Sequence, residues 1–147
     1  MKLVNPGTGE ISDRLTILAL KILAGQDAGR DVDHFESERS LLLTKIHART
    51  LNAAWFDALL ELGAVNALIW HGEDDLRDWR RAGGGGGGSG SLGSGSVYTA
   101  AENDAIRILA FRLQDWNDRR AALVQAINRE AGDVVSQEKV LADERSR

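Results

Sequence analysis

The chain has 147 residues, a net charge of −4 and no cysteine, and its only proline is Pro6. This length predicts one domain, residues 1–147, with a single modest core, and the lack of cysteine excludes thiol catalysis, disulfides and cysteine-ligated zinc. Acidic and basic residues interleave, so no basic stripe is available to bind nucleic acid. No apolar run approaches the roughly 20 residues of a membrane span. We therefore expect a cytoplasmic protein without membrane insertion.

A first helix is predicted from residue 11 onward. Its apolar residues at positions 11, 15, 18 and 22 share one helical face. Ser12 or Asp13 is placed to accept hydrogen bonds from the free amides at the helix start. The segment from Gly25 to Gly29 is expected to close this helix, because glycine readily adopts the left-handed conformation that ends one.

A second helix is predicted to begin near Asp31 or Asp33 and to continue through Arg49. Either aspartate can cap the start of this helix by accepting hydrogen bonds from its first amides. Asn52 is the predicted break between this helix and the next one, since asparagine competes with helical backbone hydrogen bonds.

Two longer helices follow, one on each side of a glycine-rich segment. In both, seam positions alternate steps of four and three residues, as a packed helical face requires. The seam of the third helix consists of Trp55, Leu59, Leu62, Asn66, Ile69, Glu73 and Leu76. The seam of the fourth helix consists of Ile106, Leu109, Leu113, Trp116, Arg120, Leu123 and Ile127. Gly132 is expected to end the fourth helix.

Residues 83–96 read GGGGGGSGSLGSGS, which is the composition of a flexible spacer. We interpret this segment as an engineered linker, with a natural glycine-rich loop as the alternative. As a random coil its ends would lie about 20 Å apart on average, enough to join neighbouring helices in either direction. The predicted fold class is therefore all-α: a four-helix, mostly antiparallel bundle interrupted by a flexible linker.

The polar seam positions need partners, because an isolated buried charge is strongly destabilising. We predict that Glu73 pairs with Arg120 across the third and fourth helices. This pair is interpreted first as a structural ion pair, and alternatively as the floor of a site in which Arg120 grips a small anionic ligand. The candidate ligand-binding residues are Asp13, Asn66, Glu73, Asp74, Asn117 and Arg120.

Other chemistry has little support in the sequence. Acidic clusters around Asp74 and Asp115 are of the kind that hold magnesium in all-α nucleotide pyrophosphohydrolases. The paired Glu-x-x-Glu pattern of those enzymes is not evident, so a solvated acidic face is the preferred interpretation. None of the three histidines has a Glu-x-x-His partner. We therefore predict no metal, no cofactor and no catalytic residue.

Three stretches of the chain form a recognisable series. They are residues 9–18, GEISDRLTIL; residues 66–78, from Asn66 through Trp70 to Asp78; and residues 117–128, NDRRAALVQAIN. In this order, together with Glu138-Lys139, they resemble a family of short bacterial all-helical proteins without an assigned activity, sometimes found near surface-polysaccharide genes. The resemblance implies one domain in native order on both sides of the linker. The family pattern has a glutamate where this chain has Ala19, which argues against an acidic role there.

Two functions are compatible with these features. The first is a small helical interaction or accessory protein, which the sequence favours over an enzyme. Such a protein would associate with itself or with a protein partner through apolar surface such as Phe56, Trp79 or Phe111. The alternative is a binding module or enzyme for a phosphorylated or sugar-nucleotide ligand, lined by the six candidate residues. The two differ in whether Glu73 and Arg120 close on each other or open onto a pocket.

Overall fold

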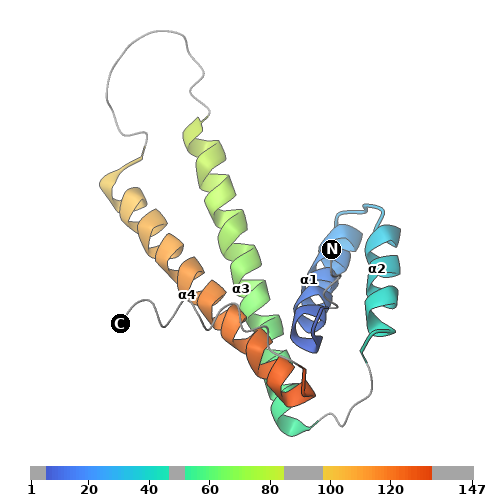
Figure 1. Cartoon of the computed structure of the whole chain (residues 1–147). Helices are drawn as coiled ribbons and strands as arrows, with labels where there is room; N and C mark the ends of the chain where they lie inside the picture. The colour runs from blue at the N-terminus through green and yellow to red at the C-terminus, as the bar shows by residue number, and fades with distance from the viewer. Residues whose placement is uncertain (1–5, 47–51, 85–97, 134–147) are drawn as a thin grey trace, which may run out of the picture.

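The computed structural model describes residues 6–46, 52–84 and 98–133, and all regular structure in that part of the chain is helical. The helices are α1 (Thr8–Asp27), α2 (Asp33–Leu43), α3 (Ala53–Gly84) and α4 (Ala100–Ala131). Figure 1 shows α3 and α4 as two long helices side by side, with α1 against their lower halves and α2 on the far side of α1. The predicted all-α class with four helices is confirmed.

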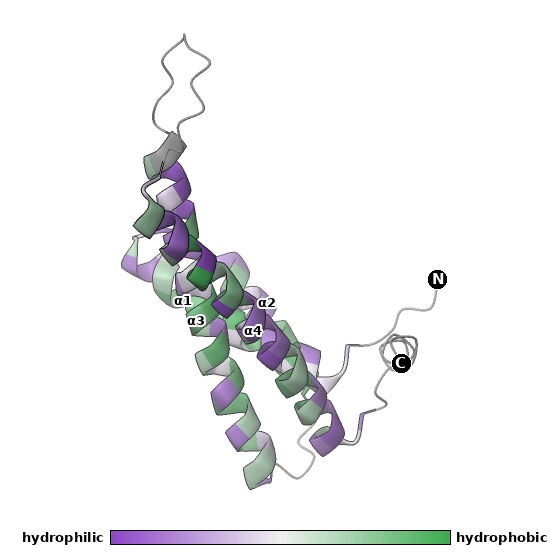
Figure 2. Cartoon of the chain, turned by 90° about the vertical axis from the view of Figure 1, so that its left-hand side faces the viewer, coloured by the Kyte–Doolittle hydropathy of each residue, from purple (hydrophilic) through white to green (hydrophobic). Residues whose placement is uncertain are grey.

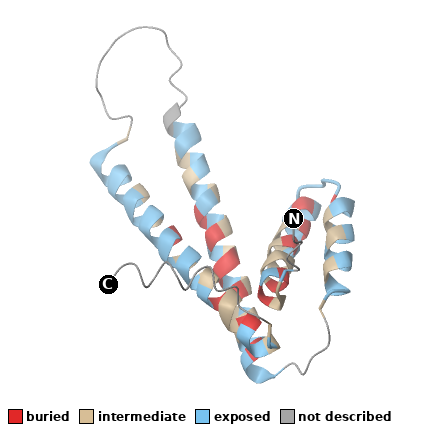
Figure 3. Cartoon of the chain, in the orientation of Figure 1, coloured by how far each residue is buried: buried red, intermediate tan, exposed pale blue. Residues whose placement is uncertain are grey.

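The core is formed by three of the helices. Leu18 of α1, Leu62 of α3 and Ile127 of α4 are fully buried. Helix α2 contacts α1 alone among the described helices, and none of its residues is buried. The apolar seams of α3 and α4 therefore pack on each other and on α1, while α2 adds an outer layer to α1 (Figure 3).

Helix α1 begins earlier than its sequence predicts. Its first residue is Thr8, so Ser12 and Asp13 lie inside the helix, and the prediction that either caps it is wrong. The free amides are satisfied from the far end of the chain instead: Thr8 N donates to Asp133 Oδ2 at 2.6 Å, and Gly9 N donates to Asn128 Oδ1 at 2.6 Å. Tertiary contacts thus replace the local cap that sequence spacing favours.

The ends of α1 and α4 agree with the predicted glycine stops. Gly29 has a φ of 62°, and Gly132 has a φ of 72°. After α1, Gly29 N donates to Gln26 O at 2.9 Å and Arg30 N donates to Gly25 O at 2.8 Å. This pair of bonds is the Schellman pattern. It requires one residue in the left-handed conformation, which glycine adopts without strain.

The starts of α2 and α3 lie close to their predicted positions. Helix α2 begins at Asp33, whose amide donates to Asp31 Oδ1 at 2.9 Å. It ends at Leu43 rather than continuing through Arg49, and residues 47–51 lie outside the described part. Asn52 marks the predicted break, and its Oδ1 caps α3 by accepting from Trp55 N at 2.8 Å.

The predicted linker overlaps α3 by two residues. Helix α3 continues through Gly83 and Gly84, which the sequence assigns to the spacer. Each glycine in a helix costs about 1 kcal/mol relative to alanine, which a helix of this length tolerates at its end. The position of a helix end is also defined only to within one or two residues. The rest of the predicted linker, residues 85–96, lies outside the described part of the chain.

The distal halves of α3 and α4 extend beyond the core. No described side chain in 73–82 or 98–112 is buried, and Figure 3 shows the buried residues gathered nearer the other end of the pair. Tyr98, which precedes α4, donates from its Oη to Trp79 O of α3 at 3.0 Å. The last turns of α3 and the first turns of α4 therefore have, among their described residues, no buried side chain to stabilise them.

Helix α4 starts with a capping box. Thr99 Oγ1 accepts from Glu102 N at 3.2 Å, and Thr99 N donates to Glu102 Oε2 at 2.7 Å. These hydrogen bonds from Thr99 lower the pKa of Glu102 below its usual range. The stabilisation that the ionised Glu102 gives to the folded protein is complete at pH values above the ordinary glutamate pKa. It is lost as the pH falls through the lowered pKa of Glu102 in the folded state.

Removing this cap gives a local prediction. Thr99→Ala is expected to speed amide hydrogen exchange in the first two turns of α4 about fivefold, since a lost N-cap weakens those turns. Amides near Leu123, in the core, act as the internal reference. Ser40→Ala is the matched control, because the Ser40 hydroxyl bonds Glu36 O within its own helix and caps nothing. Equal exchange in Thr99→Ala and the unaltered protein would contradict the capping role.

Candidate functional site

Three helices bring polar side chains together beside the core. We define the polar cluster as Asp13 and Thr16 of α1, Asn66 of α3 and Arg120 of α4. Arg120 Nε donates to Asp13 Oδ1 at 2.9 Å, and its Nη2 donates to Asp13 Oδ2 at 2.6 Å. Asn66 Nδ2 donates to Asp13 Oδ1 and to Thr16 Oγ1, both at 2.8 Å. Asp13 is therefore the centre that ties α1 to both long helices.

The position of Asp13 on α1 explains these contacts. Residues three and four apart share a helical face, so Asp13 and Thr16 both point toward Asn66, which is buried on the seam of α3. Gly63 lies one turn before Asn66 and faces Thr16, whose methyl group would lie at an ordinary contact distance of 3.8 Å from an added Cβ. An alanine would therefore fit at this position without moving α1 from α3.

The ion pair of the polar cluster is closed. The Asp13 side chain is 16% exposed and the Arg120 side chain is 31% exposed. The hydrogen bond to Asp13 raises the pKa of Arg120, burial opposes that rise, and the charges of Asp13 and Glu73 add to it. Both carboxylate oxygens accept from the guanidinium, so Asp13 occupies the Nε–Nη2 edge of Arg120. The geometry fits a structural clamp.

The predicted pairing of Glu73 with Arg120 is wrong. Arg120 hydrogen-bonds to Asp13, while Glu73 is exposed and acts on Arg120 only through its charge. Glu73 lies two turns beyond Asn66 on α3, in the half of the helix where no described side chain is buried. Its place on the apolar seam therefore does not bury it.

Three of the six candidate residues, Asp13, Asn66 and Arg120, come together, and the other three do not. Glu73 has no hydrogen bond to the cluster, as described above. Asp74 pairs with Arg77 on its own helix. Asn117 Nδ2 donates to Leu113 O one turn back on α4, at 2.9 Å. These three side chains form local contacts and do not line a shared cleft with the polar cluster.

A second polar contact, at the start of α1, was not singled out by sequence spacing. Asn128 is buried, accepts from Gly9 N through Oδ1, and donates through Nδ2 to Glu10 Oε2 at 3.0 Å. Gly9 allows this approach, because an added Cβ would lie 2.1 Å from Val124 O. The signal for this contact in the sequence was that Gly9 and Asn128 both belong to the stretches that resemble the bacterial family.

The acidic residues do not assemble a metal site in the part that the structure describes. Within residues 6–46, 52–84 and 98–133, no three histidine, aspartate or glutamate side chains are grouped as metal ligands would be. Asp74 and Asp78 instead form ion pairs with arginines three residues further along α3. These contacts belong to a solvated helix surface.

Helix α3 carries more apolar surface than the core uses. Its segment Ala53–Ala82 is long and apolar enough to cross a membrane by length and composition, contrary to the expectation that no run approaches that size. The core helix of a soluble protein meets the same criterion, and 28% of the most apolar window is buried inside this protein. The expectation of no membrane insertion stays a prediction.

Comparison with known proteins adds no relative. No family of proteins, no curated protein and no solved structure matches the chain. The resemblance of residues 9–18, 66–78 and 117–128 to a bacterial family therefore stays a prediction, although these are the stretches that supply the polar cluster and the contact between Gly9 and Asn128.

Proposed function

We propose that this protein is a small helical interaction or accessory protein of the cytoplasm that associates with a second copy of itself through α3. The folding unit in this proposal is a single four-helix, mostly antiparallel bundle over residues 1–147, with residues 83–96 as an engineered, flexible linker. The observation that carries it is a stripe of exposed apolar side chains on α3.

The outer stripe of α3 consists of Phe56, Leu60, Ala64 and Leu68, which recur every fourth residue. Phe56 is 56% exposed, Leu60 is 59% exposed and Leu68 is 46% exposed. In Figure 2 the ribbon of the N-terminal half of α3 has mostly the colour of hydrophobic residues, with polar positions between them. A helix that is apolar on more than one side is normally covered on more than one side.

The chemistry of the outer stripe favours a second copy as the partner. Its four members carry no charge, so a matching apolar ridge satisfies them without ion pairs. Residues spaced by four form one of the ridges through which helices pack, and the small side chain of Ala64 at the centre lets two such ridges cross closely. In a two-fold arrangement crossing at Ala64, Leu60 of each copy meets Leu68 of the other.

The closed polar cluster supports an interaction protein over an enzyme. Arg120 is the cation that the alternative function needs for gripping a phosphorylated ligand, and its Nε and Nη2 are both bonded to Asp13. Asn66 is likewise bonded to Asp13 and Thr16. A group that reacts with or binds a substrate must be available to it, so the cluster is better suited to holding three helices in register.

Self-association is tested by light scattering across concentrations from about 5 µM to 500 µM, a range that brackets micromolar affinity. The mass is expected to rise from 16.0 kDa toward twice that value. Leu60→Glu is expected to raise the dissociation constant at least 100-fold, because the two-fold contact buries an unpaired carboxylate from each copy. Circular dichroism checks that the variant keeps its helices.

Phe111→Glu is the matched control, because Phe111 is 62% exposed on α4 and lies outside the outer stripe. It is expected to leave the dissociation constant unchanged. A mass that stays at 16.0 kDa throughout would rule out self-association. Equal losses in Leu60→Glu and Phe111→Glu would mean that the outer stripe is not the contact.

A further inference from the structure

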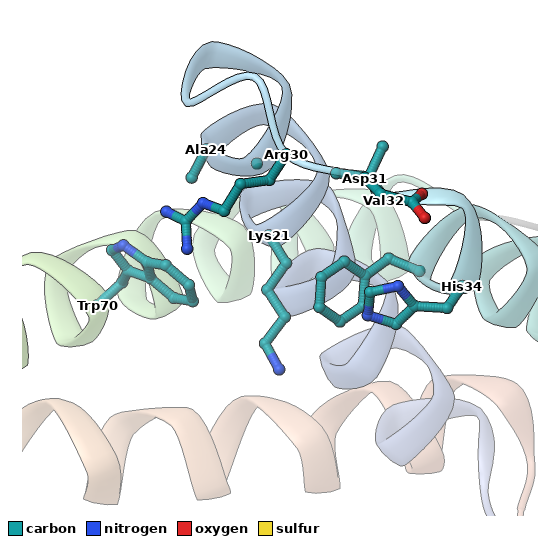
Figure 4. A pocket seen from close by; sticks show the side chains of 9 residues that line it. Lys21, Ala24, Arg30, Asp31, Val32, His34 and Trp70 are labelled. Atoms are coloured by element: carbon teal, nitrogen blue, oxygen red, sulfur yellow. The ribbon is translucent and has the colours of Figure 1, made fainter.

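An open pocket of about 350 Å³ lies away from both the polar cluster and the outer stripe. It is formed by the end of α1, the turn into α2, the start of α2 and one residue of α3, Trp70. In Figure 4 the Trp70 indole lies on one side of this space and the His34 ring on the other, with Lys21 and Arg30 between them. Aromatic and cationic side chains thus face one cavity.

The backbone around the pocket is fixed by the end of α1. Gly29 takes a left-handed conformation, and the next amide, that of Arg30, donates to Gly25 O at 2.8 Å. Gly25 is buried, and a Cβ added to it would lie 2.5 Å from Val32 Cγ1, so Val32 packs directly on the α1 backbone. The turn that carries Arg30 is therefore held against the helix rather than free to move away.

The pocket is cationic although the chain as a whole is acidic. Arg30 makes no side-chain hydrogen bond or ion pair with any described residue. The Lys21 ammonium lies 5.2 Å from the centre of the Phe35 ring. Its charge also helps to lower the pKa of Glu38, whose carboxylate is hydrogen-bonded to Arg14. Asp31 is the acidic residue of the lining; it accepts a hydrogen bond from Asp33 N, and its carboxylate points away from Trp70 in Figure 4.

The aromatic side chains offer flat surfaces next to these cations. Trp70 is half-buried at the pocket, so part of its indole faces the cavity. The His34 and Phe35 rings pack on each other, with centroids 3.8 Å apart and planes tilted by 43°. A planar ring stacks well on such a surface, and stacking contributes affinity for any base-like ring.

We propose that this pocket binds a nucleoside monophosphate, with the base stacked on Trp70 and the phosphate bound by Arg30 and Lys21. An arginine and a lysine suit the charge of one phosphate ester, and the arginine fork can donate two parallel hydrogen bonds to it. The volume is at the lower end of small-molecule sites, roughly 300 to 1,000 Å³, which favours a mononucleotide over a dinucleotide. The site is independent of the outer stripe of α3.

The experiment is calorimetric titration of the full chain with adenosine 5′-monophosphate up to about 10 mM, with adenosine and inorganic phosphate as separate titrants. The monophosphate is expected to bind at least tenfold more tightly than either fragment, because each fragment keeps only half of the contacts. Arg30→Ala and Trp70→Leu are each expected to weaken this binding about tenfold.

Arg39→Ala is the matched control, since Arg39 is an exposed arginine of α2 that does not line the pocket. The affinity of this variant for adenosine 5′-monophosphate is expected to equal that of the unaltered chain. No heat of binding with the monophosphate would overturn the proposal. Equal affinity for adenosine or for inorganic phosphate would overturn it too, as would an Arg39→Ala loss as large as that of Arg30→Ala. Circular dichroism confirms that each variant keeps its helices.

Discussion

Replacing Arg120 with leucine is expected to lower the free energy of unfolding by about 2 to 4 kcal/mol, since removal of one partner of a poorly exposed ion pair leaves the other charge uncompensated. Here the remaining charge is Asp13, which is 16% exposed and keeps only the hydrogen bond from Asn66 among its side-chain partners. The loss is measured by urea unfolding of the variant and the unaltered chain.

Two further variants separate the ion pair from the loss of one side chain. The double change Asp13→Leu with Arg120→Leu is expected to recover at least half of the stability lost in Arg120→Leu, because no buried charge remains. Arg119→Leu is the neighbouring control: its bonds to Glu61 are on the surface, and its expected cost is below about 1 kcal/mol. Undiminished stability in Arg120→Leu would refute the clamp and return Arg120 to consideration as a ligand-binding group.

Gly9→Ala is expected to destabilise the protein by about 2 to 3 kcal/mol, because the new methyl group has no room. Its Cβ would lie 2.1 Å from Val124 O, a backbone atom, and 2.8 Å from Asn128 Oδ1. Helix α1 must therefore move away from α4, which also lengthens the hydrogen bond from Gly9 N to Asn128 Oδ1. Thermal and urea unfolding both measure this loss.

Gly63→Ala is the matched control for Gly9→Ala. It is the same substitution in a helix, but the nearest atom to its Cβ is Thr16 Cγ2 at 3.8 Å, an ordinary contact. Alanine favours the helix over glycine by up to about 1 kcal/mol, so Gly63→Ala is expected to be neutral or stabilising. If both variants behave alike, close approach of α1 to α4 is not what Gly9 provides.

The helical seams were predictable because a core face repeats within one helix. Leu62 and Ile69 of α3, and Leu113 and Ile127 of α4, are buried where that repeat places them. The same repeat does not say where along a helix the neighbouring helices stop. Glu73 continues the seam of α3 but lies where that helix has no buried side chain, so it was mistaken for a core residue.

The partner of Arg120 could not be identified from spacing. Spacing assigns a residue to one face of its helix, but it does not say which residue of another helix that residue contacts. Asp13 lies 107 positions away from Arg120 and resembled a helix cap, because aspartate near a helix start usually caps it. The start of α1 is capped instead by Asn128 and Asp133, a choice made by tertiary packing. The pocket beside Trp70 was missed for the same reason: α1, a turn, α2 and α3 each contribute to it, and no motif joins them.

The hydrogen bond between Thr8 and Asp133 has a consequence for the order of the chain. It brings together two residues 125 positions apart, at the two ends of the described helical region. A circularly permuted protein could therefore join these ends directly and be opened between α3 and α4, within the predicted linker. Its helices would run in the order α4, α1, α2, α3, and every contact described for the polar cluster would be available to it.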